Sequence, residues 1–169
     1  VALADGWFHT GDVGRLEPDG CLCITDRKKD LIKTAGGKFV APQKLEKLFV
    51  ADPLISQAFV YGDKRPYCVA LLVPSAQALR RYAEEQRIPG GSLGELVRDQ
   101  RVADFYWARV QELQRELAGF EQVKKVALLD QEFTQASGEL TPTLKVKRAA
   151  VAQRHESLLN SLYPSQAVG

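Results

Sequence analysis

The stretch LISQAFVYGDKRPYCVALLVP, residues 54–74, decides the fold class of this chain. Two apolar, β-prone runs, LISQAFVYG (54–62) and YCVALLVP (67–74), flank the polar turn DKRP. Runs of this composition joined by so short a polar turn are typical of an antiparallel strand pair. We therefore expect two paired strands here, and we interpret the other segments outward from them.

Upstream of this pair, the sequence predicts a helix and a second hairpin. Pro42 suits the first turn of a helix, and apolar residues at helical spacing follow it as far as Phe49. Further upstream, the β-prone runs VGRLE and CLCITD (13–26) are joined by a Pro-Asp-Gly turn at 18–20. The sequence therefore predicts a hairpin before the helix.

Downstream of the pair, helical patterns outnumber strands. Ser75 suits the cap of a helix that runs to about Arg87, and an apolar stripe extends from Val102 to Leu117. The sequence predicts another strand over residues 123–130 and a last helix from about residue 146 to 162. A few largely antiparallel strands with flanking helices define an α+β domain, which is the class that we expect.

Composition excludes several classes of protein. The chain has 169 residues, of which 45% are apolar and 26% charged, and its formal net charge of +2 is too small to indicate a nucleic-acid partner by itself. No apolar run approaches the roughly 20 residues that span a bilayer, and the first residues do not resemble a signal peptide. We expect a cytoplasmic protein. The abrupt start at Val1 favours a fragment of a longer chain.

The cysteines and histidines predict neither disulfides nor a metal site. Cys21 and Cys23 are two residues apart on a predicted strand, so we expect them to pack on one face as small apolar residues. The two histidines are far from any Cys-x-x-Cys pair, and zinc is therefore not expected. We also expect Trp7 and Phe8 to be packing residues.

Three polar segments are candidates for chemistry. In DGWFHTGD (5–12), a Thr-Gly-Asp turn can hold the Asp12 carboxylate beside ribose hydroxyls, although such turns are common. In TDRKKDLIKTAGGKFVAPQKLE (25–46), cations near two glycines indicate either anion binding or a solvated charge run. In GELTPTLKVKR (138–148), cations at a helix start oppose the helix dipole, which indicates either a functional placement or an exposed basic turn.

In this order and spacing, the three segments resemble the adenylate-forming acyl-CoA synthetases, and the resemblance covers nearly the whole chain. The segments TAGGKFVAP, AGFEQVKKVALL and LTPTLKVKR are similar to sequences of the long-chain fatty-acid branch of that family. The resemblance implies the small C-terminal lid domain of a ligase that converts a fatty acid to an acyl-adenylate with ATP and then transfers the acyl group to CoA.

The resemblance also implies roles for individual residues. Asp12 corresponds to the aspartate that holds the ribose of ATP, and Arg27 to an arginine that contacts the ribose region. Lys145 corresponds to the catalytic lysine, chosen over Lys147 because its spacing to Arg148 fits the family pattern.

Other implied roles concern movement and the second substrate. Lys29 corresponds to the hinge about which the lid swings, and Gly36, with Gly37 beside it, to a loop along the pantetheine channel. The implied organisation is the tail of the N-terminal adenylation domain (1–26), a hinge (27–30) and the lid (31–169), with a helical insertion at about 75–120.

The expected partners are the protein's own N-terminal adenylation domain and the substrates fatty acid, ATP and CoA, with Mg²⁺ in the full-length enzyme. The phosphate loop and the fatty-acid tunnel of the family are not in this sequence, so we expect this chain to be inactive alone. Peripheral contact with a membrane is left open. So are three alternatives: a non-catalytic interaction domain, a nucleic-acid-binding domain, and an adenylating enzyme with another acceptor.

Overall fold

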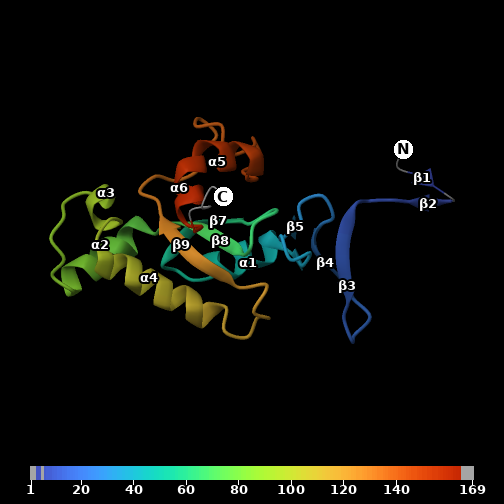
Figure 1. The fold of residues 1–169 in the computed structure, drawn as a ribbon, viewed down its shortest axis with the longest axis horizontal. Coiled ribbons are helices and arrows are strands. Elements are labelled where there is room, and N and C mark those ends of the chain that lie inside the picture. The colour runs from blue at the N-terminus through green and yellow to red at the C-terminus, as the bar shows by residue number, and fades with distance from the viewer. Residues whose placement is uncertain (1–2, 5, 165–169) are drawn as a thin grey trace.

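The computed structural model describes residues 3–4 and 6–164, and its centre is a three-stranded sheet. The strands β7 (Ile55–Tyr61), β8 (Cys68–Pro74) and β9 (Val123–Leu128) lie in the order β7-β8-β9 (Figure 1). β7 and β8 are antiparallel, as the sequence predicted, whereas β9 runs parallel to β8.

The long helical connection between β8 and β9 permits the parallel pairing. Parallel neighbours need a crossover of a dozen or more residues, and helices α2 (Ala76–Glu85), α3 (Leu93–Leu96) and α4 (Gln100–Leu113) provide it. The segment expected to be an insertion is thus the crossover itself. It also fills one of the two cores, because Tyr106 and Val110 of α4 are fully buried.

The sheet is covered on both faces, and β8 shows this most clearly. All of its residues are buried, and successive side chains point to opposite faces of a strand. Cys68, Ala70 and Leu72 join the core under α1 to α4, whereas Val69 and Leu71 join the core under the C-terminal helices. A continuous apolar run that is buried on both faces is typical of a strand inside a three-layer sandwich.

The C-terminal layer differs from the single helix expected over 146–162. It contains two short helices, α5 (Arg148–Arg154) and α6 (Glu156–Ser161), so the expectation of one helix was wrong. The break is at His155, whose φ of −106° and ψ of 21° depart from α geometry. Its ring bonds to the Glu139 carboxylate, a tertiary contact that a local sequence pattern does not contain.

On the other side of the sheet, α1 (Pro42–Val50) begins at the predicted proline and packs on β7. It is preceded by a small hairpin of β5 (Ile32–Lys33) and β6 (Phe39–Val40). The predicted α+β class is therefore confirmed.

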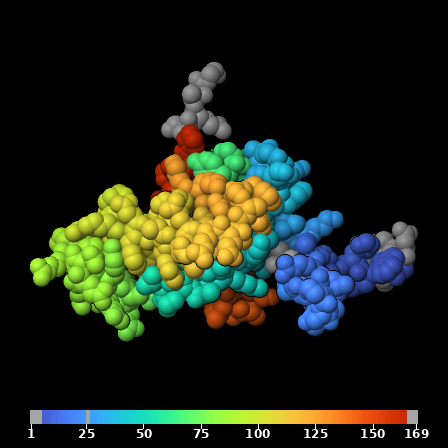
Figure 2. All heavy atoms as spheres, turned by 90° about the horizontal axis from the view of Figure 1, so that it is seen from below, coloured from blue at the N-terminus to red at the C-terminus, as the bar shows by residue number. Residues whose placement is uncertain are grey.

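The N-terminal part extends away from this body (Figures 1 and 2). β3 (Asp12–Leu16) and β4 (Leu22–Arg27) form the predicted hairpin, and β1 (Leu3–Ala4) pairs with β2 (Trp7–Phe8). The expectation that Trp7, Phe8, Cys21 and Cys23 pack as buried residues was wrong. None of residues 6–24 is buried, and these four side chains are exposed. Among the described residues, α1 is the only helix with several contacts to the hairpin, and it reaches β4 alone.

The helices of the described residues are too short or too polar for a membrane span.

Candidate functional site

A groove lies where the hairpin, α1 and the loop before α5 meet. Its volume is about 830 Å³, and we call it the hairpin groove. It is lined by residues from three distant parts of the chain: Asp12, Ile24, Arg27, Lys29, Asp30, Gln43, Glu46, Lys47, Thr141, Leu144, Lys145, Val146 and Arg148. Four of the predicted site residues are therefore brought to one surface.

Asp12 and Arg27 form the hairpin side of the groove. They are directly opposite each other in the β3–β4 register, and Arg27 Nε is 3.2 Å from Asp12 Oδ1. The turn before Asp12 is closed locally, because its N–H donates to Thr10 Oγ1 and Lys28 N–H donates to the carbonyl of Gly11. The pair thus presents a carboxylate and a guanidinium side by side, which suits a ligand with both hydroxyls and phosphates.

Lys29 lies in the short turn of residues 28–30 that follows β4. The turn is closed by a hydrogen bond from Asp30 N–H to the carbonyl of Arg27, and Asp30 also accepts from the Gln43 amide of α1. Lys29 is exposed. This turn connects the hairpin, which has no buried residues between 6 and 24, to the packed body.

Lys145 is exposed at the tip of the loop that faces the hairpin. Leu140 and Val146 form an antiparallel bridge at the base of this loop. At the tip, Thr141 N–H donates to the carbonyl of Lys145, and Lys145 N–H donates to Thr141 Oγ1. The backbone is thus fixed, while the ammonium has no salt bridge within the part of the chain that the structure describes.

The residue beside it, Leu144, has a φ of 59°, which is uncommon for a side chain other than glycine, asparagine or aspartate. Its side chain is exposed. Strained backbone of this kind persists only where its surroundings hold it, as the hydrogen bonds around Thr141 do here.

Arg148 has the opposite character to Lys145. Its guanidinium lies 2.7 Å from Glu46 Oε1, donates to the carbonyl of Val60 and covers the ring of Phe59 at 4.8 Å from the centroid. Glu46 in turn accepts from the N–H of Val60. Arg148 therefore anchors the start of α5 to α1 and β7, whereas Lys145 and Lys147 are exposed and have no salt bridge within the described residues.

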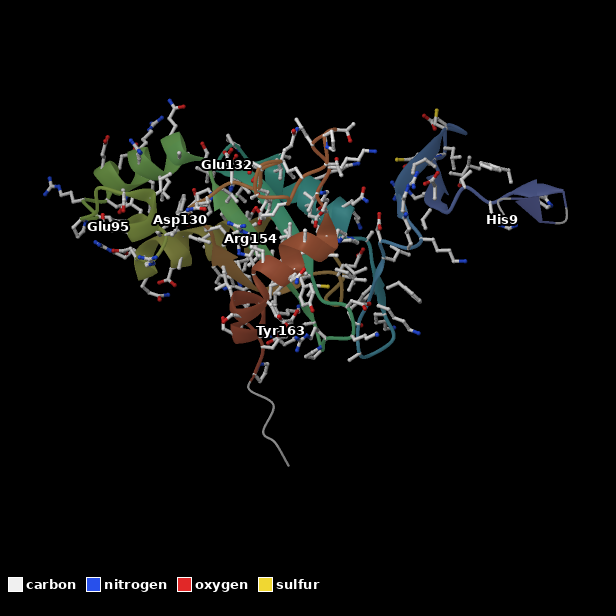
Figure 3. The ribbon with its side chains drawn as sticks, turned by 90° about the horizontal axis from the view of Figure 1, so that it is seen from above. His9, Glu95, Asp130, Glu132, Arg154 and Tyr163 are labelled. Carbon is white, nitrogen blue, oxygen red and sulfur yellow. The ribbon has the colours of Figure 1, made fainter. Side chains whose placement is uncertain are left out.

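A second anchor lies on the other side of the loop. The Glu139 side chain is only 4% exposed and accepts from Ser137 Oγ and from His155 Nε2, the latter at 2.9 Å. Its backbone carbonyl accepts from Lys147 N–H. Arg154 lies 3.7 Å from the same carboxylate and is labelled in Figure 3. The loop is therefore fixed at both ends by carboxylates, of which Glu139 is buried and Glu46 partly buried.

Sequence reasoning missed these anchors. Glu46 and Arg148 are 102 positions apart, and no periodic pattern links them. Glu139 and His155 are 16 positions apart on opposite sides of the loop. In the sequence, the position of Glu139 in a loop of mixed apolar and polar residues is only a weak indication that its side chain is buried.

Gly36 and Gly37 do not line the hairpin groove. They form the turn between β5 and β6, where Gly37 has a φ of 74° and its N–H donates to the carbonyl of Thr34. The turn is tied to residues 62–65 through the bond from Ala35 N–H to the carbonyl of Arg65. No atom lies within 4 Å of a Cβ built at Gly36, so its backbone is open to a ligand.

The described residues contain no group of three or more His, Cys, Asp or Glu side chains that fits a metal ion. Asp12 and Asp30 line the same groove, but each is already bonded to a neighbour. The described residues therefore do not fit Mg²⁺ by themselves.

A family model and curated proteins both match this chain over most of its length. The family model described as AMP-binding enzyme C-terminal domain matches residues 29–167. A long-chain-fatty-acid–CoA ligase of Mycobacterium tuberculosis is 42% identical over 163 residues, which cover 96% of this chain and 27% of that protein. Long-chain-fatty-acid–CoA ligase 5 of Mus musculus is 38% identical, over 95% of this chain and 24% of its own length.

Solved structures agree in fold. The adenylation domain of a carboxylate reductase from Mycobacterium chelonae matches with a TM-score of 0.75 and 32% identity, over 94% of this chain and 23% of that one. The corresponding domain from Segniliparus rugosus, solved with AMP and a co-purified carboxylic acid, matches with a TM-score of 0.71 and 31% identity, over 94% and 23%. This chain spans about a quarter of the length of the curated relatives that it matches.

Proposed function

The chain belongs to the family of AMP-binding enzyme C-terminal domains, and from that membership we propose that it is the lid of a long-chain fatty acid–CoA ligase. In this function ATP activates a fatty acid to an acyl-adenylate, and the acyl group then passes to CoA. One observation carries the proposal: Asp12, Arg27 and Lys145 come from distant segments and line one groove.

In the first half-reaction, a fatty-acid carboxylate attacks the α-phosphorus of ATP and pyrophosphate leaves. Two anions must approach each other, and a cation between them offsets their repulsion and orients them. Lys145 suits this role because it is exposed and has no salt bridge within residues 3–4 and 6–164. The Asp12 carboxylate accepts hydrogen bonds from the ribose hydroxyls, and Arg27 lies beside it.

In the second half-reaction, the CoA thiol attacks the acyl carbonyl, loses its proton, and AMP leaves. The lysine loop must then move away so that the thiol can enter. We assign residues 27–30 as the hinge and Lys29 as its pivot, because the short turn there connects a hairpin without a core to a packed body. Gly36 and Gly37, on the open β5–β6 turn, are assigned to the pantetheine channel.

The proposed partner of the lid is the N-terminal adenylation domain, of which residues 1–26 are the tail and which supplies the remaining ATP and fatty-acid contacts. The apolar side chains that the hairpin exposes, among them Leu16, Leu22 and Ile24, support this assignment. Mg²⁺ enters with ATP and is held outside this chain. We place the reaction in the cytoplasm, with peripheral membrane contact open because the substrate is apolar.

CoA is proposed as the acceptor on the strength of the ligase relatives, whose identity of up to 42% exceeds the 32% of the carboxylate reductase domain. The adenylation step is common to both groups. An assay of the second half-reaction therefore distinguishes the two acceptors.

The experiment uses the full-length enzyme that contains this chain, with Lys145→Ala and, as a matched control, Lys147→Ala. Both lysines are exposed and only two residues apart. We measure oleate-dependent ATP–pyrophosphate exchange and, separately, oleoyl-CoA formation from preformed oleoyl-adenylate.

Lys145→Ala is expected to slow the exchange by about 100- to 1,000-fold, as loss of one transition-state contact typically does, and to preserve the transfer step. Lys147→Ala is expected to preserve both. If the exchange survives in Lys145→Ala and fails in Lys147→Ala, the catalytic role belongs to Lys147. If it survives in both, the lid proposal is wrong.

A further inference from the structure

The two edges of the central sheet are treated differently. Along β7, side chains cover the outer backbone groups: Glu46 accepts from the N–H of Val60 at 2.8 Å, and Arg148 donates to the carbonyl of Val60. The amide of Gln57 on the same strand is bonded to the backbone of Phe133. The outer backbone groups of Val60 are therefore not available to another strand.

The β9 edge is open over most of its length. The Gln114 amide bonds both the N–H and the carbonyl of Val123 at the start of the strand. From Lys124 to Leu128, no hydrogen bond from the described residues reaches the backbone on the side away from β8. An edge of this length with unpaired backbone groups is a template for another strand.

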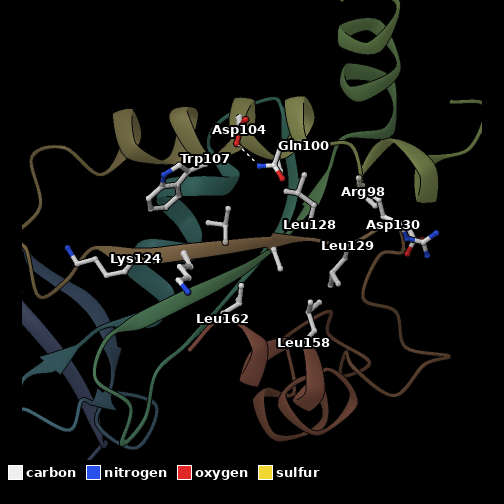
Figure 4. Close-up of a pocket in the computed structure, with 15 residues that line it drawn as sticks. Arg98, Gln100, Asp104, Trp107, Lys124, Leu128, Leu129, Asp130, Leu158 and Leu162 are labelled. Atoms are coloured by element: carbon white, nitrogen blue, oxygen red, sulfur yellow. Dashed lines mark hydrogen bonds between the residues drawn. The ribbon is translucent and has the colours of Figure 1, made fainter. Parts of the chain in front are cut away.

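A groove of about 630 Å³ follows this edge, and we call it the β9 groove. Its walls are α4 on one side and α6 on the other (Figure 4). Trp107 on the α4 wall, and Leu158 and Leu162 on the opposite wall, are only partly buried. The edge thus combines free hydrogen-bonding groups with apolar surface on both sides, the two features that hold an added strand.

The order of charges along the edge identifies the strand that fits it. Lys124 and Lys125 lie at its start and Asp130 lies just past its end, all three exposed, and none has a salt bridge within the described chain. A strand with cations at one end and an anion at the other is complementary to an antiparallel copy of itself. Parallel pairing would instead place like charges together.

We propose that two copies of this chain pair through β9 to form a continuous six-stranded sheet across a twofold axis. The register centred on Ala127 places Lys124 opposite Asp130 of the second copy at both ends. The small side chain of Ala127 then lies on the axis, where two Cβ atoms approach to about 4.5–5.5 Å. Such an interface is isologous, as in most closed dimers.

This pairing goes beyond the proposed ligase function and does not depend on it, because none of the residues that line the β9 groove lines the hairpin groove. A peptide from an unrelated protein has no reason to match both ends of the edge. The second copy does so by symmetry.

The experiment measures the oligomeric state of the full chain by sedimentation velocity over a wide concentration series. Lys124→Asp and Asp130→Lys are examined alone and as an equimolar mixture. Each variant alone places like charges opposite each other at both ends, whereas the mixture restores opposite charges at both ends. Arg80→Asp, an exposed position on α2 outside the groove, is the matched control.

We expect a reversible dimer for the wild type and for Arg80→Asp. Each single variant alone should weaken the dimer at least about tenfold, and the mixture should recover it to within about threefold. Far-ultraviolet circular dichroism checks that every variant is folded. A monomeric wild type at all concentrations would overturn the proposal and leave the groove to another strand. So would a dimer that persists in both single variants, or a mixture that does not recover.

Discussion

The hairpin and β8 are both strands rich in apolar residues, yet only β8 is buried. Leu16 and Leu22 form a cross-strand pair in the hairpin and are 70% and 68% exposed. Every residue of β8 is buried between two layers of helices. The apolar pattern of a strand therefore indicates which side chains can be buried. Whether they are buried depends on another element or another domain that packs against them. None of the described hairpin residues up to Ile24 is buried, and we propose that the adenylation domain covers this surface.

The largest expected effect is on stability, and it separates the two regions directly. Phe49→Ala removes a fully buried ring from the core under α1 and should lower the free energy of unfolding by about 3–5 kcal/mol. Leu16→Ala in the hairpin should change it by less than about 0.5 kcal/mol, because the side chain is already solvated. Urea titration of the full chain measures both. Comparable losses would mean that the hairpin is part of the folding unit.

Much of this architecture could be predicted from local sequence. The β7–β8 pair, the start of α1 at Pro42 and the β3–β4 hairpin all follow from turn chemistry and periodicity. The parallel placement of β9 could not be predicted, because nothing local to residues 123–128 specifies which neighbour the crossover selects. The helix break at His155 could likewise not be predicted from local sequence, since it depends on a contact with Glu139 in another segment.

The candidate site divides in the same way. Motifs identified Asp12, Arg27, Lys29 and Lys145, and all four line the hairpin groove. Their catalytic and binding roles stay predictions. What the motifs did not identify is the support behind Lys145, because the anchors are pairs of residues that only the fold brings together.

Ion pairs give the second test of the comparison. Glu46 contacts both Arg148 and the N–H of Val60 with little solvent around it, so Glu46→Gln leaves a half-buried guanidinium without its counter-charge. We expect a loss of about 1–3 kcal/mol in the free energy of unfolding. In the hairpin, Glu17→Gln removes the partly exposed partner of the exposed Arg15 and should leave the unfolding midpoint unchanged.

Urea unfolding at low and at high salt distinguishes the two pairs further. The Glu46 effect should persist in high salt because partly buried charge pairs are screened much less than exposed ones. An effect that vanishes with salt would show that the Glu46–Arg148 pair acts as a surface pair, and the contrast between the regions would then rest on apolar burial alone.

The smallest expected effect concerns the cysteines and appears only at alkaline pH. Cys23 in the hairpin is exposed, whereas Cys68 at the start of β8 is fully buried. Burial raises the pKa of the Cys68 thiol to about 11, and nearby Arg148 opposes the shift only in part. Well below pH 9 both the folded and the unfolded chain keep this proton, so the group has almost no effect on stability there.

Between pH 9 and 11 the unfolded chain loses the thiol proton while the folded chain keeps it, so the free energy of unfolding should fall as pH rises. The fall from this group is at most about 1.4 kcal/mol per pH unit. Burial also raises the pKa of Tyr106 and Tyr163, whose contributions begin near pH 10, so the informative window is pH 9 to 10. In that window Cys68→Ala should flatten the stability profile and Cys23→Ala should not. Equal slopes in the wild type and in Cys68→Ala would show that water reaches the β8 thiol, and the sharpest contrast between the two regions would be lost.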